Sequence, residues 1–132
     1  MKFLCFAWEE EQALNALSEA EWAVLRRETL DYVDTLRASG RLIDAQPLQS
    51  ATTGSVVRVR NGRTAVTDGP FVETKEQIGG FFLLDVADHD EAVRIAAGWP
   101  SARIGSIEVR PLEDGLSTDS RYASGRMAKA SA

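Results

Sequence analysis

The stretch of sequence that decides the fold runs from residue 55 to residue 86 and reads SVVRVRNGRTAVTDGPFVETKEQIGGFFLLDV. Its first half contains two runs rich in β-branched residues on either side of Asn61-Gly62, the residue pair favoured in type I′ turns. A two-residue loop fixes the pairing of the flanking strands, so we expect a β-hairpin over 55–67 in which Val57 faces Val66.

The second half of this stretch predicts a turn, a loop and a buried strand. Asp68-Gly69-Pro70-Phe71 directs the chain out of the hairpin, because a residue before proline is pushed toward an extended conformation. Residues 72–77 are polar and predict a loop or a single helical turn. After two glycines, residues 81–86 are apolar on both faces, which is typical of a central strand that is covered on both sides.

The N-terminal part of the chain predicts a strand, a long helix and a second, weaker strand. Residues 2–8 are largely apolar on both faces and predict a central strand. Ser18 and Glu21 have the spacing of a capping box, and Gly40 is a typical residue at a helix end, so we expect a helix between them. Residues 41–47 predict a weak strand or an extended connection.

The C-terminal part predicts a second helix and a last strand. Asp88 and Glu91 repeat the capping pattern before a face of small residues, and Gly98 to Pro100 ends that helix. Residues 106–111 alternate between apolar and polar side chains, as expected of a strand. We therefore expect one domain over 1–113 and a small, polar C-terminal tail over 114–132.

The composition excludes several classes of protein. The 132 residues carry 15 Lys and Arg against 20 Asp and Glu, so the formal net charge of −5 disfavours nucleic-acid binding. The single cysteine and single histidine exclude an internal disulfide and make a zinc site improbable. We expect no metal, no cofactor, no membrane association and a cytoplasmic location.

The order of the elements predicts an α+β fold in which two helices cover one face of an antiparallel sheet. The central strands are apolar on both faces, so the second face would expose a large apolar patch to water. We therefore expect this face to be covered by a second copy of the chain, related by a two-fold axis, in a homodimer. A cleft between the two sheets would then be the place to look for a small-molecule ligand.

Three segments resemble the YCII-related domain family, in the branch with the DGPF motif. They are residues 66–76, which contain Asp68-Gly69-Pro70-Phe71, the run 79–83, and the run 107–111. The resemblance implies a ferredoxin-like βαββαβ unit with an inserted β-hairpin, forming a dimeric α+β barrel. Other branches of the family are thought to use a histidine near the first strand, paired with an acid. Residues 8–20 of this chain contain no histidine, so that chemistry does not carry over.

The loop after the hairpin contains the candidate catalytic residues Asp68, Glu73 and Lys75. Two carboxylates beside an ammonium group can shift one another's pKa values enough for proton transfer, provided that the loop packs over a cleft. The structural alternative is that Asp68 forms a turn with its own backbone, Phe71 anchors the loop in the core, and the other charges are solvated.

The candidate ligand-binding residues are Arg58, on the hairpin, and Glu108 and Arg110, on the last strand. Ile107 and Val109 are expected to point toward the helices, so Glu108 and Arg110 point the other way, toward the cleft. The alternatives are an ordinary ion pair for Glu108 and Arg110. For the hairpin arginines the alternative is protection of a strand edge by charge.

The residues leave three functions open. The first is a small-molecule binder or a proton-transfer enzyme with its cleft inside the dimer, in line with enzymes of this fold that act on small aromatic compounds. The second is a regulatory module without catalysis, since proteins that resemble this one are often encoded beside extracytoplasmic-function sigma factors. The third is a structural dimer with a degenerate cleft.

Overall fold

The computed structural model describes residues 1–113, and the tail predicted over 114–132 lies outside the described residues. The main sheet has four antiparallel strands in the order β2-β5-β1-β6. These strands are β1 (Lys2–Glu9), β2 (Leu42–Pro47), β5 (Gln77–Asp85) and β6 (Ser106–Pro111). The apolar strands β1 and β5 are central, which confirms the prediction from their two-sided apolar pattern.

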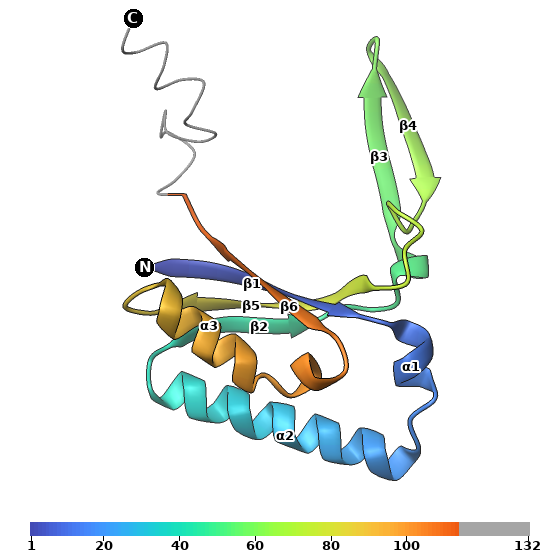
Figure 1. Cartoon of the computed structure of the whole chain (residues 1–132). Coiled ribbons are helices and arrows are strands. Elements are labelled where there is room, and N and C mark those ends of the chain that lie inside the picture. The colour runs from blue at the N-terminus through green and yellow to red at the C-terminus, as the bar shows by residue number, and fades with distance from the viewer. Residues whose placement is uncertain (114–132) are drawn as a thin grey trace, which may run out of the picture.

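The helices lie on one side of this sheet, as Figure 1 shows. The two long helices are α2 (Glu19–Ala38) and α3 (His89–Gly98), and a short helix α1 (Glu11–Asn15) follows β1. Both long helices begin at the predicted caps, because the Ser18 hydroxyl accepts from the Glu21 N–H and Asp88 accepts from the Glu91 N–H. The order β1-α2-β2-β5-α3-β6 is the ferredoxin-like βαββαβ arrangement, which confirms the expected α+β fold.

The inserted hairpin forms a sheet of its own rather than an edge of the main sheet. It comprises β3 (Ser55–Arg60) and β4 (Arg63–Asp68), joined to β2 through the 3-10 helix η1 (Ala51–Thr53). Val57 pairs with Val66, as predicted, and the turn residues Asn61 and Gly62 both have positive φ angles. In Figure 1 the hairpin rises on the side of the main sheet that is opposite to the helices.

The core lies between the sheet and the helices. Phe82 is fully buried and stacks on Trp99, with ring centroids 3.9 Å apart and an interplanar angle of 7°. Tyr32 of α2 meets the same Trp99 edge-on, and its hydroxyl donates a 2.8 Å hydrogen bond to the carbonyl of Ile95 in α3. Pro100 begins the 3-10 helix η2 (Pro100–Arg103), which leads into β6. These contacts fix α3 against α2 over the buried face of the sheet.

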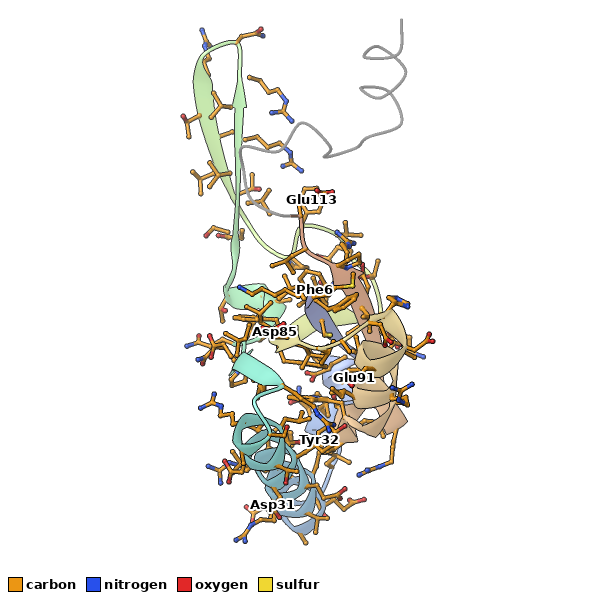
Figure 2. The ribbon with its side chains drawn as sticks, turned by 90° about the vertical axis from the view of Figure 1, so that its left-hand side faces the viewer. Phe6, Asp31, Tyr32, Asp85, Glu91 and Glu113 are labelled. Atoms are coloured by element: carbon orange, nitrogen blue, oxygen red, sulfur yellow. The ribbon has the colours of Figure 1, made fainter. Side chains whose placement is uncertain are left out.

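Within residues 1–113, the other face of the sheet carries no helix. Side chains alternate along a strand, so Phe6 lies on the face opposite to its fully buried neighbour Cys5. Figure 2 shows Phe6 on the side from which the hairpin rises, while Tyr32 lies among the helices. Leu4, Phe6, Phe81 and Leu83 are only partly buried on this open face. No helix within residues 1–113 is long and apolar enough to cross a membrane.

Candidate functional site

The first group of polar side chains lies on the open face, at strand β6. Register pairing places Glu108 opposite Phe6 and Arg110 opposite Leu4, so both side chains share the face that the helices leave uncovered. The alternating neighbours Ile107 and Val109 pack against the core. The predicted orientation of Glu108 and Arg110 is therefore confirmed.

A connected set of contacts orders these side chains. The indole Nε1–H of Trp8 donates a 3.0 Å hydrogen bond to Oε1 of Glu108, and Oε2 of Glu108 forms an ion pair with Arg110. The Arg110 guanidinium also lies over the ring of Phe6, 5.7 Å from its centroid. The Trp8 and Arg110 donors lower the pKa of Glu108, so this carboxylate stays charged at neutral pH.

The loop after the hairpin begins with a close approach of two backbone segments. The N–H of Gly69 donates a 2.7 Å hydrogen bond to the carbonyl of Gly54, and the Gly69-Pro70 peptide bond is cis. A Cβ atom on Gly69 would lie 3.1 Å from the Gly54 backbone, closer than ordinary contact. Glycine at position 69 therefore lets the start of the loop lie directly against the end of η1.

An apolar cavity of about 390 Å³ opens beside this loop. Its lining includes Trp8, Pro70, Phe71 and Ile78, together with Val56 of the hairpin. Phe71 is 71% exposed, so the structural alternative in which it anchors the loop in the core is wrong. The physical reason is that the loop leaves the main sheet together with the hairpin and does not reach the layer between sheet and helices.

The arginines of the hairpin are exposed, and one of them contacts a residue that lines this cavity. The Arg58 guanidinium lies 5.3 Å from the centroid of the Phe71 ring, a cation–π contact at the cavity wall. Arg60 and Arg63 flank the turn at the far end of the hairpin, and the pairing register places them opposite each other. Only Arg58 is thus placed where it could contact a ligand in the cavity.

The three predicted catalytic residues do not form one cluster. Asp68 ends β4 opposite Ser55 and is exposed, as is Glu73 in the loop. The Nζ of Lys75 lies 3.6 Å from Oε2 of Glu10, at the end of the first strand. Within residues 1–113, no hydrogen bond or ion pair joins Asp68, Glu73 and Lys75 to one another. Lys75 instead forms an ion pair that ties the loop to Glu10.

A second cavity, of about 500 Å³, contains acidic residues that the sequence analysis did not single out. Glu9, at the end of β1, and Glu11, at the start of α1, both line it. The Glu11 carboxylate accepts hydrogen bonds of 2.7 Å from the Ser50 hydroxyl and from the Ala51 N–H, which lower its pKa. Burial and the charge of Glu11 raise the pKa of Glu9.

One feature of the sequence could have drawn attention to Glu9. The glycine at position 79 faces it across the strand pair, and a Cβ atom there would overlap the Glu9 carboxylate. Gly79 lies at the register shift between β1 and β5, where Gly80 pairs with Ala7 and Ile78 pairs with Trp8. A glycine in the interior of a strand often marks such a close approach, but the sequence does not say what approaches it.

The described part of the chain contains no cluster suited to a metal ion. Within residues 1–113 there is no group of three or more His, Cys, Asp or Glu side chains that could hold one. The single histidine, His89, is exposed at the start of α3, where its ring lies 5.7 Å from that of Phe3. The titratable groups available for chemistry near the two cavities are therefore carboxylates, arginines and Lys75.

Comparison with known proteins agrees with this architecture. In a search of solved structures, the chain resembles 5-chloro-2-hydroxyhydroquinone dehydrochlorinase (TftG) from Burkholderia phenoliruptrix AC1100, in complex with 2,5-dihydroxybenzoquinone. The TM-score is 0.55 at 16% identity, and the match covers 90% of this chain and all of that one, which supports the fold. An uncharacterised protein of Rhizobium meliloti (strain 1021), R00369, is 35% identical over 114 residues, covering 85% of this chain and 92% of the relative. The family model of the YCII-related domain matches residues 1–114, and the chain therefore belongs to the YCII-related domain family.

Proposed function

We propose that this protein is a homodimer that binds a small aromatic anion in a cleft over the open face of its sheet and transfers a proton there. The observation that carries the proposal is the double role of Trp8. Its side chain lines the apolar cavity beside the loop, and its indole N–H binds Glu108, which is paired with Arg110. One residue thus joins an apolar surface to an ordered pair of charges.

The shape and chemistry of the cleft favour a flat, partly charged ligand. Trp8, Phe71 and Ile78 supply aromatic and aliphatic surface. Arg58 lies over the ring of Phe71, and Arg110 is connected to Trp8 through Glu108, so each adds a cationic group beside a lining residue or its hydrogen-bond partner. Apolar walls with a few placed polar groups are typical of small-molecule sites. The dehydrochlorinase of similar fold was solved with 2,5-dihydroxybenzoquinone, a small ring compound with acidic hydroxyl groups, which supports a ligand of this class.

In this proposal the second copy of the chain closes the cleft. The open face exposes parts of Leu4, Phe6, Phe81 and Leu83, and a second sheet packed on it would remove them from water. Asp68 and Glu73, both exposed, are the proposed proton acceptors, because they adjoin the loop residues that line the cavity, whereas Lys75 is paired with Glu10. Packing of the partner over the loop would shield these exposed carboxylates from water, which a general base in a closed site requires.

The binding experiment uses 2,5-dihydroxybenzoquinone in titration calorimetry with the full chain. We expect Arg110→Gln to weaken binding by about tenfold or more, because a charge-assisted contact to the ligand is lost. The matched control is Arg103→Gln, since Arg103 pairs with Glu28 on the helical side and lies in neither cavity. Equal affinity of all three proteins, or no binding, would contradict the proposed ligand class.

Two further measurements test the dimer and the proton acceptor. Light scattering at micromolar concentration should give about twice the chain mass of 14.4 kDa, and a monomer mass would contradict the dimer. Asp68→Asn keeps the hydrogen-bonding capacity of the side chain and removes its charge. If Asp68 accepts the proton, this variant should keep its thermal stability and lose about tenfold or more in turnover, whereas unchanged turnover would exclude Asp68 from that role.

A further inference from the structure

We propose that the cavity at the end of β1 is a binding site for a primary amine with an apolar body, and that Glu9 holds its ammonium group. This site is separate from the proposed cleft: no residue lines both cavities within the described part of the chain. Its volume of about 500 Å³ lies within the range of small-molecule sites.

The charge of the lining favours a cation. Glu9, Glu11 and Glu19 all line the cavity, and none of its lining residues among residues 1–113 is Lys, Arg or His. Lys75 forms an ion pair with Glu10, which adjoins Glu9 and Glu11 in the sequence but does not line the cavity. An anionic ligand would therefore meet only like charges in this cavity, whereas a cation would meet carboxylates that no cationic lining residue neutralises.

The two carboxylates at the end of β1 have different roles in this site. Glu11 already accepts from Ser50 and Ala51, and these contacts hold α1 against the segment that follows β2. The carboxylate of Glu9 receives no hydrogen bond and no ion pair from any residue within 1–113. A half-buried carboxylate without a hydrogen-bond donor lowers the stability of the fold. An ammonium group would supply both the hydrogen-bond donors and the positive charge that the carboxylate lacks.

The backbone of Glu9 is held by the sheet rather than by a flexible loop. Glu9 pairs with Gln77, and its carboxylate lies over the backbone of Gly79, where any larger residue would overlap it. Burial and the neighbouring Glu11 charge raise the pKa of Glu9, and a bound cation would oppose both effects. Ligand binding and ionisation of Glu9 are thus expected to favour each other.

The rest of the cavity suits the apolar part of such a ligand. Its apolar lining comes from four segments. Leu14 belongs to α1 and Leu17 to the turn after it, while Leu48 follows β2 and Trp22 belongs to α2. Trp22 is 49% exposed, so its ring is open to a ligand. An aromatic face beside a carboxylate is a favourable arrangement for an ammonium group that carries a hydrocarbon chain.

The test compares three probes of nearly equal shape, 2-phenylethylamine, 2-phenylethanol and 3-phenylpropionate, by titration calorimetry with the full chain. We expect the amine to bind about tenfold or more tightly than the alcohol, because only the amine forms a charge-assisted contact. The propionate should bind most weakly of the three, because it meets the carboxylates of the lining.

Two variants assign the effect to Glu9. Glu9→Gln keeps the size of the side chain and should lower the affinity of the protein for the amine by about tenfold or more. The affinity of this variant for the alcohol should stay within about twofold of that of the unchanged protein. Glu76→Gln makes the same charge change outside the cavity lining and should leave the amine affinity within about twofold. Circular dichroism of both variants confirms that they fold.

Several results would overturn the inference. Equal binding of amine and alcohol would mean that the carboxylate does not select for charge. Preference for the propionate would mean that Glu9 acts as a neutral donor instead. Unchanged amine affinity in Glu9→Gln, or no amine binding at about 10 mM, would also refute it. None of these results bears on Arg110 or the other cavity, so the two proposals fail independently.

Discussion

Replacing Trp8 by phenylalanine removes the hydrogen bond that links a residue lining the apolar cavity to the charged pair on the open face. The ring remains large and apolar, but the Nε1–H donor at 3.0 Å from Glu108 is lost. A hydrogen bond to a charged group contributes about 1.5–3 kcal/mol when it is well buried. The Glu108 side chain is 34% exposed, so solvent screening reduces this contribution to about 1 kcal/mol.

The pH dependence of this loss identifies its origin. The pKa of Glu108 in the folded protein is lowered from 4.5, first by the Trp8 hydrogen bond and then by Arg110. A carboxylate with a lowered pKa stabilises the fold above its unfolded value, and this stabilisation is lost as the pH falls through the folded value. The cost of Trp8→Phe should therefore be complete at pH 7 and should shrink as the pH falls below 4.5.

Urea unfolding at a fixed protein concentration measures the free energy of unfolding at both pH values. At pH 7 the expected loss of about 1 kcal/mol corresponds to roughly 3–5 °C in the melting midpoint for a domain of this size. The matched control is Trp22→Phe, because Trp22 is half-exposed and its indole N–H donates no hydrogen bond within residues 1–113. Equal losses in both variants, or a loss independent of pH, would refute the role assigned to the Trp8 hydrogen bond.

Three further predictions concern the ends of β1 and the core. Glu9→Gln should stabilise the protein at pH 7, because the raised pKa of Glu9 means that its charged form destabilises the fold. This gain should disappear below pH 4.5 in thermal melts, and a gain independent of pH would contradict it. Phe82→Ala should cost about 3–5 kcal/mol in urea unfolding, since it empties a fully buried site stacked on Trp99, and a cost below about 1 kcal/mol would contradict that packing. Cys5 should resist thiol reagents until the protein unfolds, because burial raises its pKa to about 12, and rapid labelling in native buffer would show that β1 opens.

The parts of the fold that were predictable from sequence are those whose physics is local. The hairpin register follows from Asn61-Gly62, because few other residue pairs accept positive φ at both positions. The two long helices begin at side chains that satisfy free N–H groups within three residues. The faces of β1 and β6 follow from simple alternation. Each of these signals is complete within a short stretch of chain.

The elements that are stabilised by contacts between residues far apart in the sequence were not predicted. Helix α1 has five residues, no side-chain cap and no buried residue, so its sequence carries little helical signal. Its first residue, Glu11, is bound by Ser50 and Ala51, about 40 positions away. The same limit applies to the charged loop, because whether Lys75 meets Asp68, Glu73 or Glu10 depends on the path of the loop through space.

The three consecutive acids Glu9, Glu10 and Glu11 show why this limit matters for function. In sequence they are alike, yet each meets a different environment. Glu10 pairs with Lys75, and Glu11 accepts two hydrogen bonds that lower its pKa. Glu9 is half-buried without a donor within residues 1–113, and its burial and the Glu11 charge raise its pKa. Chemical reactivity arises where a charge is left uncompensated, and that depends on which partners the fold brings to the same place. Of the three, only Glu9 combines an uncompensated carboxylate with a neighbouring cavity, so a ligand rather than the chain itself is expected to complete its hydrogen bonds.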